Sequence, residues 1–159
     1  MWRDSTFKIA LFGHRDFCGH KALEERLFPL LRELVLKHTF TDIYIGRNGE
    51  FDVFTATIVK RLQKHLGKEL VDLICVLPYT DKNIEYYEKY YDSVIIPECV
   101  EGCYPKGAIT KRNRWMIDEV DLVICYVEEK SGGAYSALKY ALSVGISVIN
   151  LAEERGEFS

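Results

Sequence analysis

The sequence predicts a Rossmann-like α/β fold, a doubly wound and mainly parallel sheet of five to six strands with helices on both faces. Three observations predict it. Short apolar runs rich in β-branched residues recur along the chain and are nearly continuous in apolar character, as is typical of parallel strands covered on both faces. Segments with one apolar helical face lie between these runs. Strand and helix alternate five times, which indicates right-handed βαβ crossovers.

The apolar runs define the expected strands. They cover residues 7–12, 42–46, 71–77, 94–96, 121–127 and 147–151. The run at 94–96 is the shortest, and those at 71–77 and 121–127 are the longest.

Helical periodicity predicts the connecting segments. Leucines at one-face spacing indicate a helix over 23–34, and phenylalanine, isoleucine and leucine side chains indicate a second over 51–66. Three more helices are expected over 83–91, 109–119 and 134–144. Gly67 and Gly145 follow two of these segments, where glycine commonly ends a helix.

Length and composition favour one folded domain over residues 1–159. The chain is 48% hydrophobic, but no apolar run approaches the roughly 20 residues of a membrane span, so no membrane association is expected. The net charge of −3 makes nucleic acid an unlikely partner, because phosphate neutralisation needs a basic surface. Five cysteines without regular spacing, two of them inside expected strands, favour a reducing cytoplasmic setting.

The candidate site residues follow the expected strands, because open α/β sheets bind ligands at the carboxyl ends of their strands. Gly13, His14 and Arg15 follow the first strand. Glycine permits a tight turn and close approach to a ligand, and Arg15 can pair with a phosphate through two hydrogen bonds. The alternative for Arg15 is a solvated turn residue.

A second candidate loop follows the second strand. Gly46, Arg47, Asn48 and Gly49 precede a helix, so backbone N–H groups here can face an anion. Asp52 in the first helical turn can cap the helix or accept hydrogen bonds from ribose hydroxyls.

A third glycine-rich turn precedes the last helix. Ser131, Gly132, Gly133 and Ala134 again bring a loop to a helix N-terminus, and two such turns predict one shared anion or nucleotide cleft. Tyr79, after the third strand, can stack on a base or pack at the rim of the cleft.

The segment before the strand at 121–127 adds two candidates. Asn113 interrupts the apolar stripe of its helix and needs a hydrogen-bond partner, either backbone or ligand. Arg112 lies beside it and is either solvated or a part of the cleft.

No metal is expected. His14, Cys18 and His20 are close in sequence, and Cys99 and Cys103 form a C-x-x-x-C pattern. Neither grouping shows the paired ligand clusters of a structural zinc site.

These residues together resemble the SLOG superfamily, and most closely its YpsA-like branch. The resemblance covers nearly the whole chain and rests on the order and spacing of its motifs. They are Phe12, Gly13, His14 and Arg15; Gly46, Gly49 and Asp52; Arg112, Asn113 and Met116 before Asp121; and Gly132 with Gly133. The resemblance implies a Rossmann-like fold that binds nucleotides or nucleotide-derived ligands, in many members as sensors and often as a homo-oligomer.

The resemblance also bears on catalysis. The similar Lonely-Guy phosphoribohydrolases use an arginine at the position of Arg112 and a glutamate in the helix after their glycine turn; the similar deoxyribosyltransferases place a glutamate nucleophile there. This chain has Ala137 and Leu138 in the matching region and no carboxylate through Val144. Glycosidic hydrolysis usually needs a carboxylate beside the sugar, so the departure favours binding over catalysis.

Three functions follow as hypotheses. The favoured one is a sensor or regulatory domain for a signalling nucleotide or an ADP-ribose-like or NAD-like molecule, without a required cofactor. The first alternative is a hydrolase or transferase acting on N-glycosidic bonds of nucleosides or nucleotides. The second is a protein-interaction module whose cleft is unused.

Overall fold

A six-stranded parallel sheet forms the centre of the protein and confirms the predicted fold class. A computed structural model describes residues 5–153, in which the strand order is β4-β3-β2-β1-β5-β6 and five α-helices connect the strands. Every neighbouring pair of strands is parallel.

The strand bounds follow the apolar runs closely, and none differs from its expected position by more than two residues. The strands are β1 (Thr6–Gly13), β2 (Phe40–Ile45), β3 (Val71–Val76), β4 (Ser93–Ile95), β5 (Leu122–Tyr126) and β6 (Ser147–Asn150).

The helices also lie where periodicity predicts them, with two clear differences in length: the first helix extends three residues beyond each expected end, and the fourth begins four residues early. They are α1 (His20–Lys37), α2 (Glu50–Leu66), α3 (Ile84–Tyr90), α4 (Pro105–Glu119) and α5 (Gly133–Val144), with a short 3-10 turn, η2, at Glu98–Val100. Helix α4 begins four residues before the expected 109 because Pro105 starts it. Proline suits this position, where its fixed φ is helical and its missing N–H is not needed.

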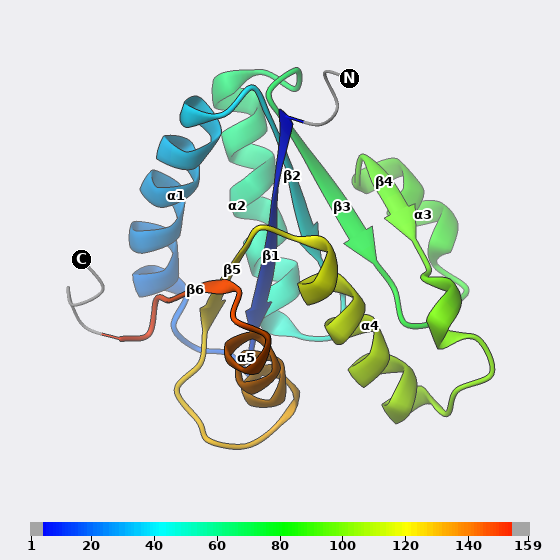
Figure 1. The fold of residues 1–159 in the computed structure, drawn as a ribbon. Helices are drawn as coiled ribbons and strands as arrows, with labels where there is room; N and C mark the ends of the chain where they lie inside the picture. The colour runs from blue at the N-terminus through cyan, green and yellow to red at the C-terminus, as the bar shows by residue number, and fades with distance from the viewer. Residues whose placement is uncertain (1–4, 154–159) are drawn as a thin grey trace.

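Each face of the sheet has its own apolar core. Ile9 and Leu11 of β1 face the side covered by α1, α2 and α3, whereas Ala10 and Phe12 face the side covered by α4 and α5. Figure 1 shows these two layers on opposite sides of the sheet. Alternate strand residues point to opposite faces, so apolar residues at successive positions are needed, which explains the continuous apolar runs in the sequence.

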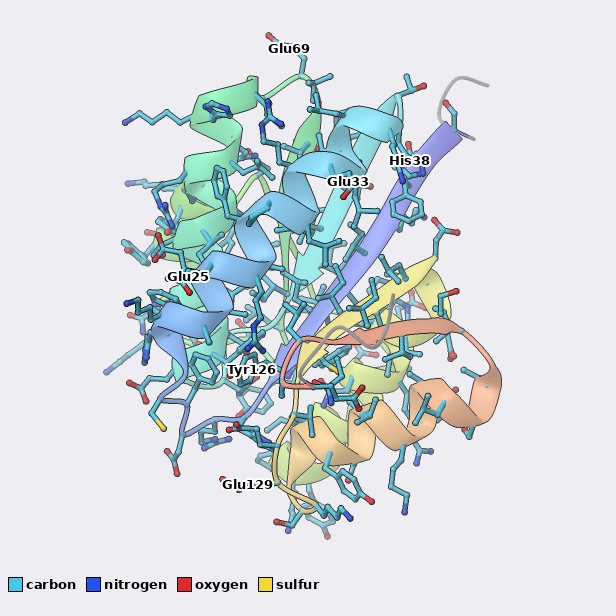
Figure 2. The ribbon with its side chains drawn as sticks, turned by 90° about the vertical axis from the view of Figure 1, so that its left-hand side faces the viewer. Glu25, Glu33, His38, Glu69, Tyr126 and Glu129 are labelled. Carbon is cyan, nitrogen blue, oxygen red and sulfur yellow. The ribbon has the colours of Figure 1, made fainter. Side chains whose placement is uncertain are left out.

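The chain reverses its direction of travel across the sheet at β1. From β1 it proceeds outward through β2, β3 and β4, and α4 then carries it back to β5 on the other side of β1. The carboxyl ends of β1 and β5 therefore form the topological switch point, where open α/β sheets bind ligands. In Figure 2, Glu129 marks this end of the sheet, and His38 and Glu69 lie at the opposite end.

The helices of the described chain, residues 5–153, are too short or too polar to span a membrane.

Candidate functional site

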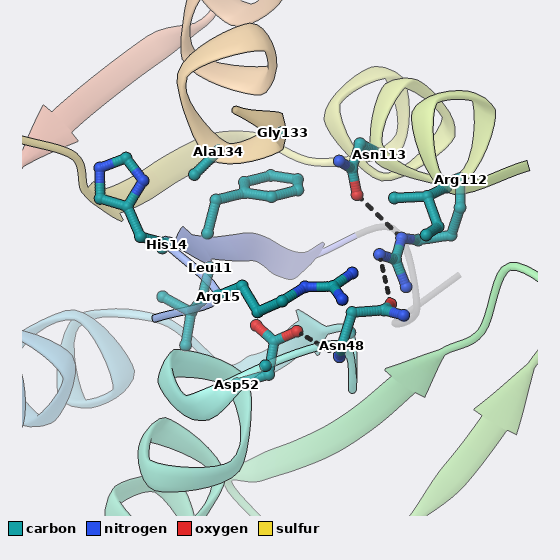
Figure 3. Close-up of a pocket in the computed structure, with 14 residues that line it drawn as sticks. Leu11, His14, Arg15, Asn48, Asp52, Arg112, Asn113, Gly133 and Ala134 are labelled. Atoms are coloured by element: carbon teal, nitrogen blue, oxygen red, sulfur yellow. Dashed lines mark hydrogen bonds between the residues drawn. The ribbon is translucent and has the colours of Figure 1, made fainter. Parts of the chain in front are cut away.

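A cavity lies at the switch point, between the loops after β1 and β2, the middle of α4 and the first turn of α5. It has a volume of about 110 Å³. Its walls come from four segments that are far apart in the sequence and that meet at one rim of the sheet (Figure 3). The lining residues are Leu11, Phe12, Gly13, His14, Arg15, Gly46, Asn48, Gly49, Asp52, Ile109, Arg112, Asn113, Gly133 and Ala134.

The side chain of Arg112 joins α4 to the loop after β2 and to the end of β3. It is only 3% exposed, and its Nη1 donates to the carbonyl oxygen of Val76 at the end of β3 at 2.7 Å. Its Nη2 donates to Asn48 Oδ1 at 2.9 Å and its Nε to Asn113 Oδ1 at 2.8 Å. Burial lowers the pKa of Arg112, and the negative charge of Asp52 opposes that shift. Arg112 therefore shapes the cavity wall from within the protein.

Asp52 is the one carboxylate among the residues that line this cavity. Its Oδ2 accepts a hydrogen bond from the backbone N–H of Asn48 at 2.9 Å, which ties the β2–α2 loop to the first turn of α2. Burial raises the pKa of Asp52, although this hydrogen bond and the charges of Arg112, Arg47 and Arg15 lower it. The observed hydrogen bond anchors the loop before the helix, and Asp52 also lines the cavity, so ribose binding by its carboxylate stays a prediction.

The raised pKa of Asp52 makes a prediction about stability. A carboxyl whose pKa is higher in the folded state contributes stability that is complete below the unfolded-state pKa of about 3.9 and is lost as pH rises through the folded-state pKa. Asp52→Asn does not titrate but keeps an acceptor for Asn48. We therefore expect the free energy of unfolding of Asp52→Asn, relative to the unmodified chain, to increase as pH rises from about 4.

Urea denaturation across this pH range measures the effect. Glu25→Gln, at an exposed position on α1 (Figure 2), is the control for removing one carboxylate. A difference between Asp52→Asn and the unmodified chain that stays constant with pH would contradict the prediction.

Both glycines of the loop after β2 are required by packing. A Cβ at Gly46 would lie 2.7 Å from Nη1 of Arg112 and 3.1 Å from Oδ2 of Asp52, and one at Gly49 would lie 2.5 Å from the Cα of Arg15. These glycines let other parts of the chain approach closely. At both positions the space left by the absent side chain is filled by the protein itself.

The glycine turn before α5 differs from the other two. Gly132 has a φ of +91°, a conformation that favours glycine, and a Cβ at Gly133 would meet no atom within 4 Å. The N–H groups of Gly133 and Ala134 have no intrahelical acceptor, since the first bond of the helix runs from the Ser136 N–H to the Gly132 carbonyl. Among residues 5–153 no side chain caps this helix, and its first residue borders both cavities.

Two side chains near this helix end have unused donors. Asn113 is only 9% exposed; its Oδ1 accepts from Arg112, while its Nδ2 makes no hydrogen bond with residues 5–153. The side chain of Arg15 makes neither a hydrogen bond nor an ion pair within the same range and extends across the cavity between Asp52 and Asn113 (Figure 3). Both groups border the cavities and have donors available to a bound acceptor.

His14 fixes the loop that leads to α5. Its Nε2 accepts hydrogen bonds from the backbone N–H groups of Glu128 and Glu129, both at 3.1 Å. Acceptance at Nε2 means that the proton of the neutral ring is on Nδ1. His14 therefore connects the loop after β1 with the loop after β5.

A second, outer cavity of about 370 Å³ adjoins the first between α4 and α5. Arg15, Ile109, Asn113 and Gly133 line both, so the two are continuous. The remaining lining residues of the outer cavity are Lys106, Thr110, Arg114, Gly132, Ser136, Ala137 and Tyr140.

The structure brings most of the predicted site residues to these cavities but not all. Gly132 lines the outer cavity only, and Arg47, Tyr79 and Ser131 line neither. The guanidinium of Arg47 lies 4.9 Å from the ring centroid of Tyr87 on α3, on the far side of the loop. Tyr79 follows β3 and is exposed; it lies near enough to Arg112 to oppose the lowering of its pKa but does not line either cavity.

Several lining residues were not predicted from the sequence. Leu11, Phe12 and Ile109 belong to the inner cavity, and Lys106, Thr110, Arg114 and Tyr140 belong to the outer one. The three-to-four-residue spacing of Lys106, Ile109, Thr110 and Asn113 along α4 is a signal that could have found this wall.

The potential metal-ligating side chains of the described residues do not cluster. Residues 5–153 contain no group of three or more His, Cys, Asp or Glu side chains that could hold a metal ion. Cys99 and Cys103 are free thiols in the turn around η2.

The sheet order and the cavity at its switch point place the chain in the Rossmann-like α/β class. No protein-family model and no curated protein matches the sequence. Solved structures do match. DNA processing protein A from Helicobacter pylori, described as having a unique single-stranded DNA binding mode, aligns with a TM-score of 0.61 at 20% identity over 91% of this chain. DNA processing protein A from Streptococcus pneumoniae aligns with a TM-score of 0.54 at 13% identity over 92% of this chain.

These similarities show a common fold. The chain spans 65% of the length of the Helicobacter pylori chain and 59% of the Streptococcus pneumoniae chain, so it spans less than two thirds of either. Similarity to DNA processing protein A agrees with the resemblance to the SLOG superfamily at the level of the fold. The YpsA-like branch stays a prediction.

Proposed function

We propose that this chain binds a nucleotide or nucleotide-derived small molecule at the switch-point cavity and acts as a sensor or regulatory domain. The observation that carries the proposal is the convergence of unused donors: the amides at the N-terminus of α5, Nδ2 of Asn113 and the guanidinium of Arg15. A phosphate supplies acceptors for all three, and a helix N-terminus favours negative charge.

The remaining geometry suits the nucleoside part. Asp52 lies across the cavity from Asn113 and offers a carboxylate acceptor for ribose hydroxyls. The inner cavity of about 110 Å³ accommodates a group of phosphate or ribose size, and the outer cavity extends the space into the range of small-molecule sites. We expect this ligand to bind without a cofactor.

Arg15→Ala tests the proposal. Ligand at 100 times its dissociation constant stabilises the folded state by about 2.7 kcal/mol, so a panel of nucleoside phosphates should raise the melting temperature of the unmodified chain. Arg15→Ala removes a charge-assisted contact and should weaken the binding of the active nucleotide by about tenfold or more.

The control is Arg32→Ala, which removes the same charge from an exposed position on α1. Both variants should retain the unliganded melting temperature, because the Arg15 side chain makes no hydrogen bond with residues 5–153 and its carbonyl still accepts from Glu50. The absence of any ligand-dependent shift across nucleotides, NAD derivatives and ADP-ribose would contradict the proposal and favour the protein-interaction module.

A catalytic function is the second candidate, and Asp52 is the observation that favours it. A raised pKa is a feature of general acids. Asp52 lines the inner cavity, whereas the neighbouring Glu50 is exposed and does not. Helix α5 has no carboxylate to act with it. Release of free base from nucleoside monophosphates is the measurement that separates hydrolysis from binding.

Single-stranded DNA is the ligand described for the Helicobacter pylori protein, so an oligonucleotide belongs in the panel. The net charge of −3 disfavours it here, and binding of DNA would weaken steeply with salt. Homo-oligomerisation, implied by the SLOG resemblance, stays a prediction that sedimentation can test.

A further inference from the structure

The outer cavity concentrates positive charge in a protein whose overall charge is negative. Arg15, Lys106 and Arg114 line it, and none of its lining residues is an aspartate or glutamate. The whole chain carries 24 acidic and 21 basic residues, so this local balance departs from the average of the sequence. A cleft lined by one sign of charge raises the local concentration of ligands of the opposite sign.

The three cations form no direct ion pair within the described residues, 5–153. Arg114 lies over the ring of Tyr140 at 4.9 Å from its centroid, and the nearby carboxylate of Asp118 accepts from the hydroxyl of Tyr140 at 2.8 Å. Tyr140 thus connects α4 and α5 and holds Arg114 at the wall of the cavity.

The polar groups around these cations are also suited to an oxyanion. Thr110 and Ser136 contribute hydroxyls from the two helices that face each other. Arginine, lysine and hydroxyl donors are the groups that bind phosphate oxygens, whereas a nucleobase needs an open aromatic face. The ring of Tyr140 is already covered by Arg114.

Arg15 and Asn113 link this outer group of donors to the inner cavity. Both residues line both cavities, and both have donors that are not used within the described chain. Arg15 could therefore contact two anions. One would bind at the N-terminus of α5, and the other would bind beside Lys106 and Arg114.

We propose that the outer cavity binds a second phosphate group of the same ligand, so that the site selects a pyrophosphate-containing nucleotide over a mononucleotide. This inference rests on the proposed function, because it places the first phosphate in the inner cavity. Lys106 and Arg114 determine the selection, and Arg15 contributes to both phosphate positions.

The test compares four ligands on one double variant. AMP, ADP-ribose, inorganic pyrophosphate and a short single-stranded oligonucleotide are titrated calorimetrically against the unmodified chain and Lys106→Ala/Arg114→Ala. The unmodified chain should bind ADP-ribose about tenfold or more tightly than AMP, the effect of at least one charge-assisted hydrogen bond. The double variant should lose this preference and leave the affinity for AMP within about twofold.

The matched control is Arg32→Ala/Lys111→Ala. It removes the same charge from exposed positions on α1 and α4 that line neither cavity, so it should keep the preference for ADP-ribose. Circular dichroism and the unliganded melting temperature establish that both double variants fold. Equal binding of AMP and ADP-ribose by the unmodified chain, or an equal loss in both double variants, overturns the inference.

The remaining outcomes bear on both this inference and the proposed function. If no nucleotide binds but pyrophosphate does, and only Lys106→Ala/Arg114→Ala weakens it, the outer cavity is an anion site, but the nucleotide proposal and the selection of a pyrophosphate-containing nucleotide both fall. If neither nucleotides nor pyrophosphate bind, both fall. If the oligonucleotide binds more tightly than ADP-ribose and it alone is weakened in the double variant, the cavity serves DNA and the inference is overturned.

Discussion

Replacing Arg112 with methionine is expected to destabilise the protein by about 3–5 kcal/mol, the usual cost of removing one partner from a buried charged network. The substitution removes the two hydrogen bonds that join α4 to the end of β3 and to the β2–α2 loop, and a third to Asn113 on α4. It leaves the Val76 carbonyl and two side-chain amide oxygens without these donors, and Asp52 without its nearest buried cation.

Arg114→Met is the matched control, since it makes the same substitution two residues further along α4. Arg114 is exposed and its main described contact is the ring of Tyr140, so a cost below about 1 kcal/mol is expected. Chemical denaturation measures both. Similar losses of unfolding free energy in the two variants would show that the hydrogen bonds of Arg112 to β3 and to the β2–α2 loop do not stabilise the fold.

Introducing a single methyl group at Gly13 is expected to destabilise the protein by about 1–3 kcal/mol through overpacking. The Cβ of Gly13→Ala would lie 2.2 Å from the ring of Phe51, which is 2% exposed. Phe51 cannot move aside freely because the ring of Phe17 packs edge-on against it at 5.5 Å. The end of β1 and the start of α2 must therefore separate, which also opens the floor of the cavity.

A double-mutant cycle with Phe51→Leu identifies this mechanism. The smaller side chain should cost less in the Gly13→Ala background than in the unmodified chain, with a coupling energy of about 1 kcal/mol or more. Gly107→Ala is the control, because its Cβ meets no atom within 4 Å and alanine is favoured over glycine in a helix. Additive effects at Gly13 and Phe51 would contradict the overpacking explanation.

Local patterns in the sequence were sufficient to predict the secondary structure. Apolar runs and helical periodicity arise from burial against the sheet, so they mark each strand and most helix bounds within one or two residues. The start of α4 was missed because Pro105 and Lys106 lie at its exposed end, where there is no pattern of buried apolar residues to indicate a helix.

The structure brings the predicted loops to one cavity but not all of the predicted side chains. The rule that ligands bind at the carboxyl ends of strands placed Gly46 and Gly133 at one rim, and the structure brings them to the same cavity. No sequence rule distinguished Arg47, which packs against α3, from Arg112, which is buried in the cavity wall. The direction of a side chain depends on which elements pack beside it.

The sequence by itself determined the Rossmann-like fold class, the order of strands and helices, and the loops from which a site can be built, because hydrophobic periodicity and turn residues act over short stretches of chain. Only the tertiary structure decided that Gly46 makes room for Arg112, that Asn113 and Arg15 have unused donors at the same cavity, and that Lys106 and Arg114 form a second one. These features depend on close packing between segments that are far apart in the chain, and such packing cannot be predicted from local sequence patterns.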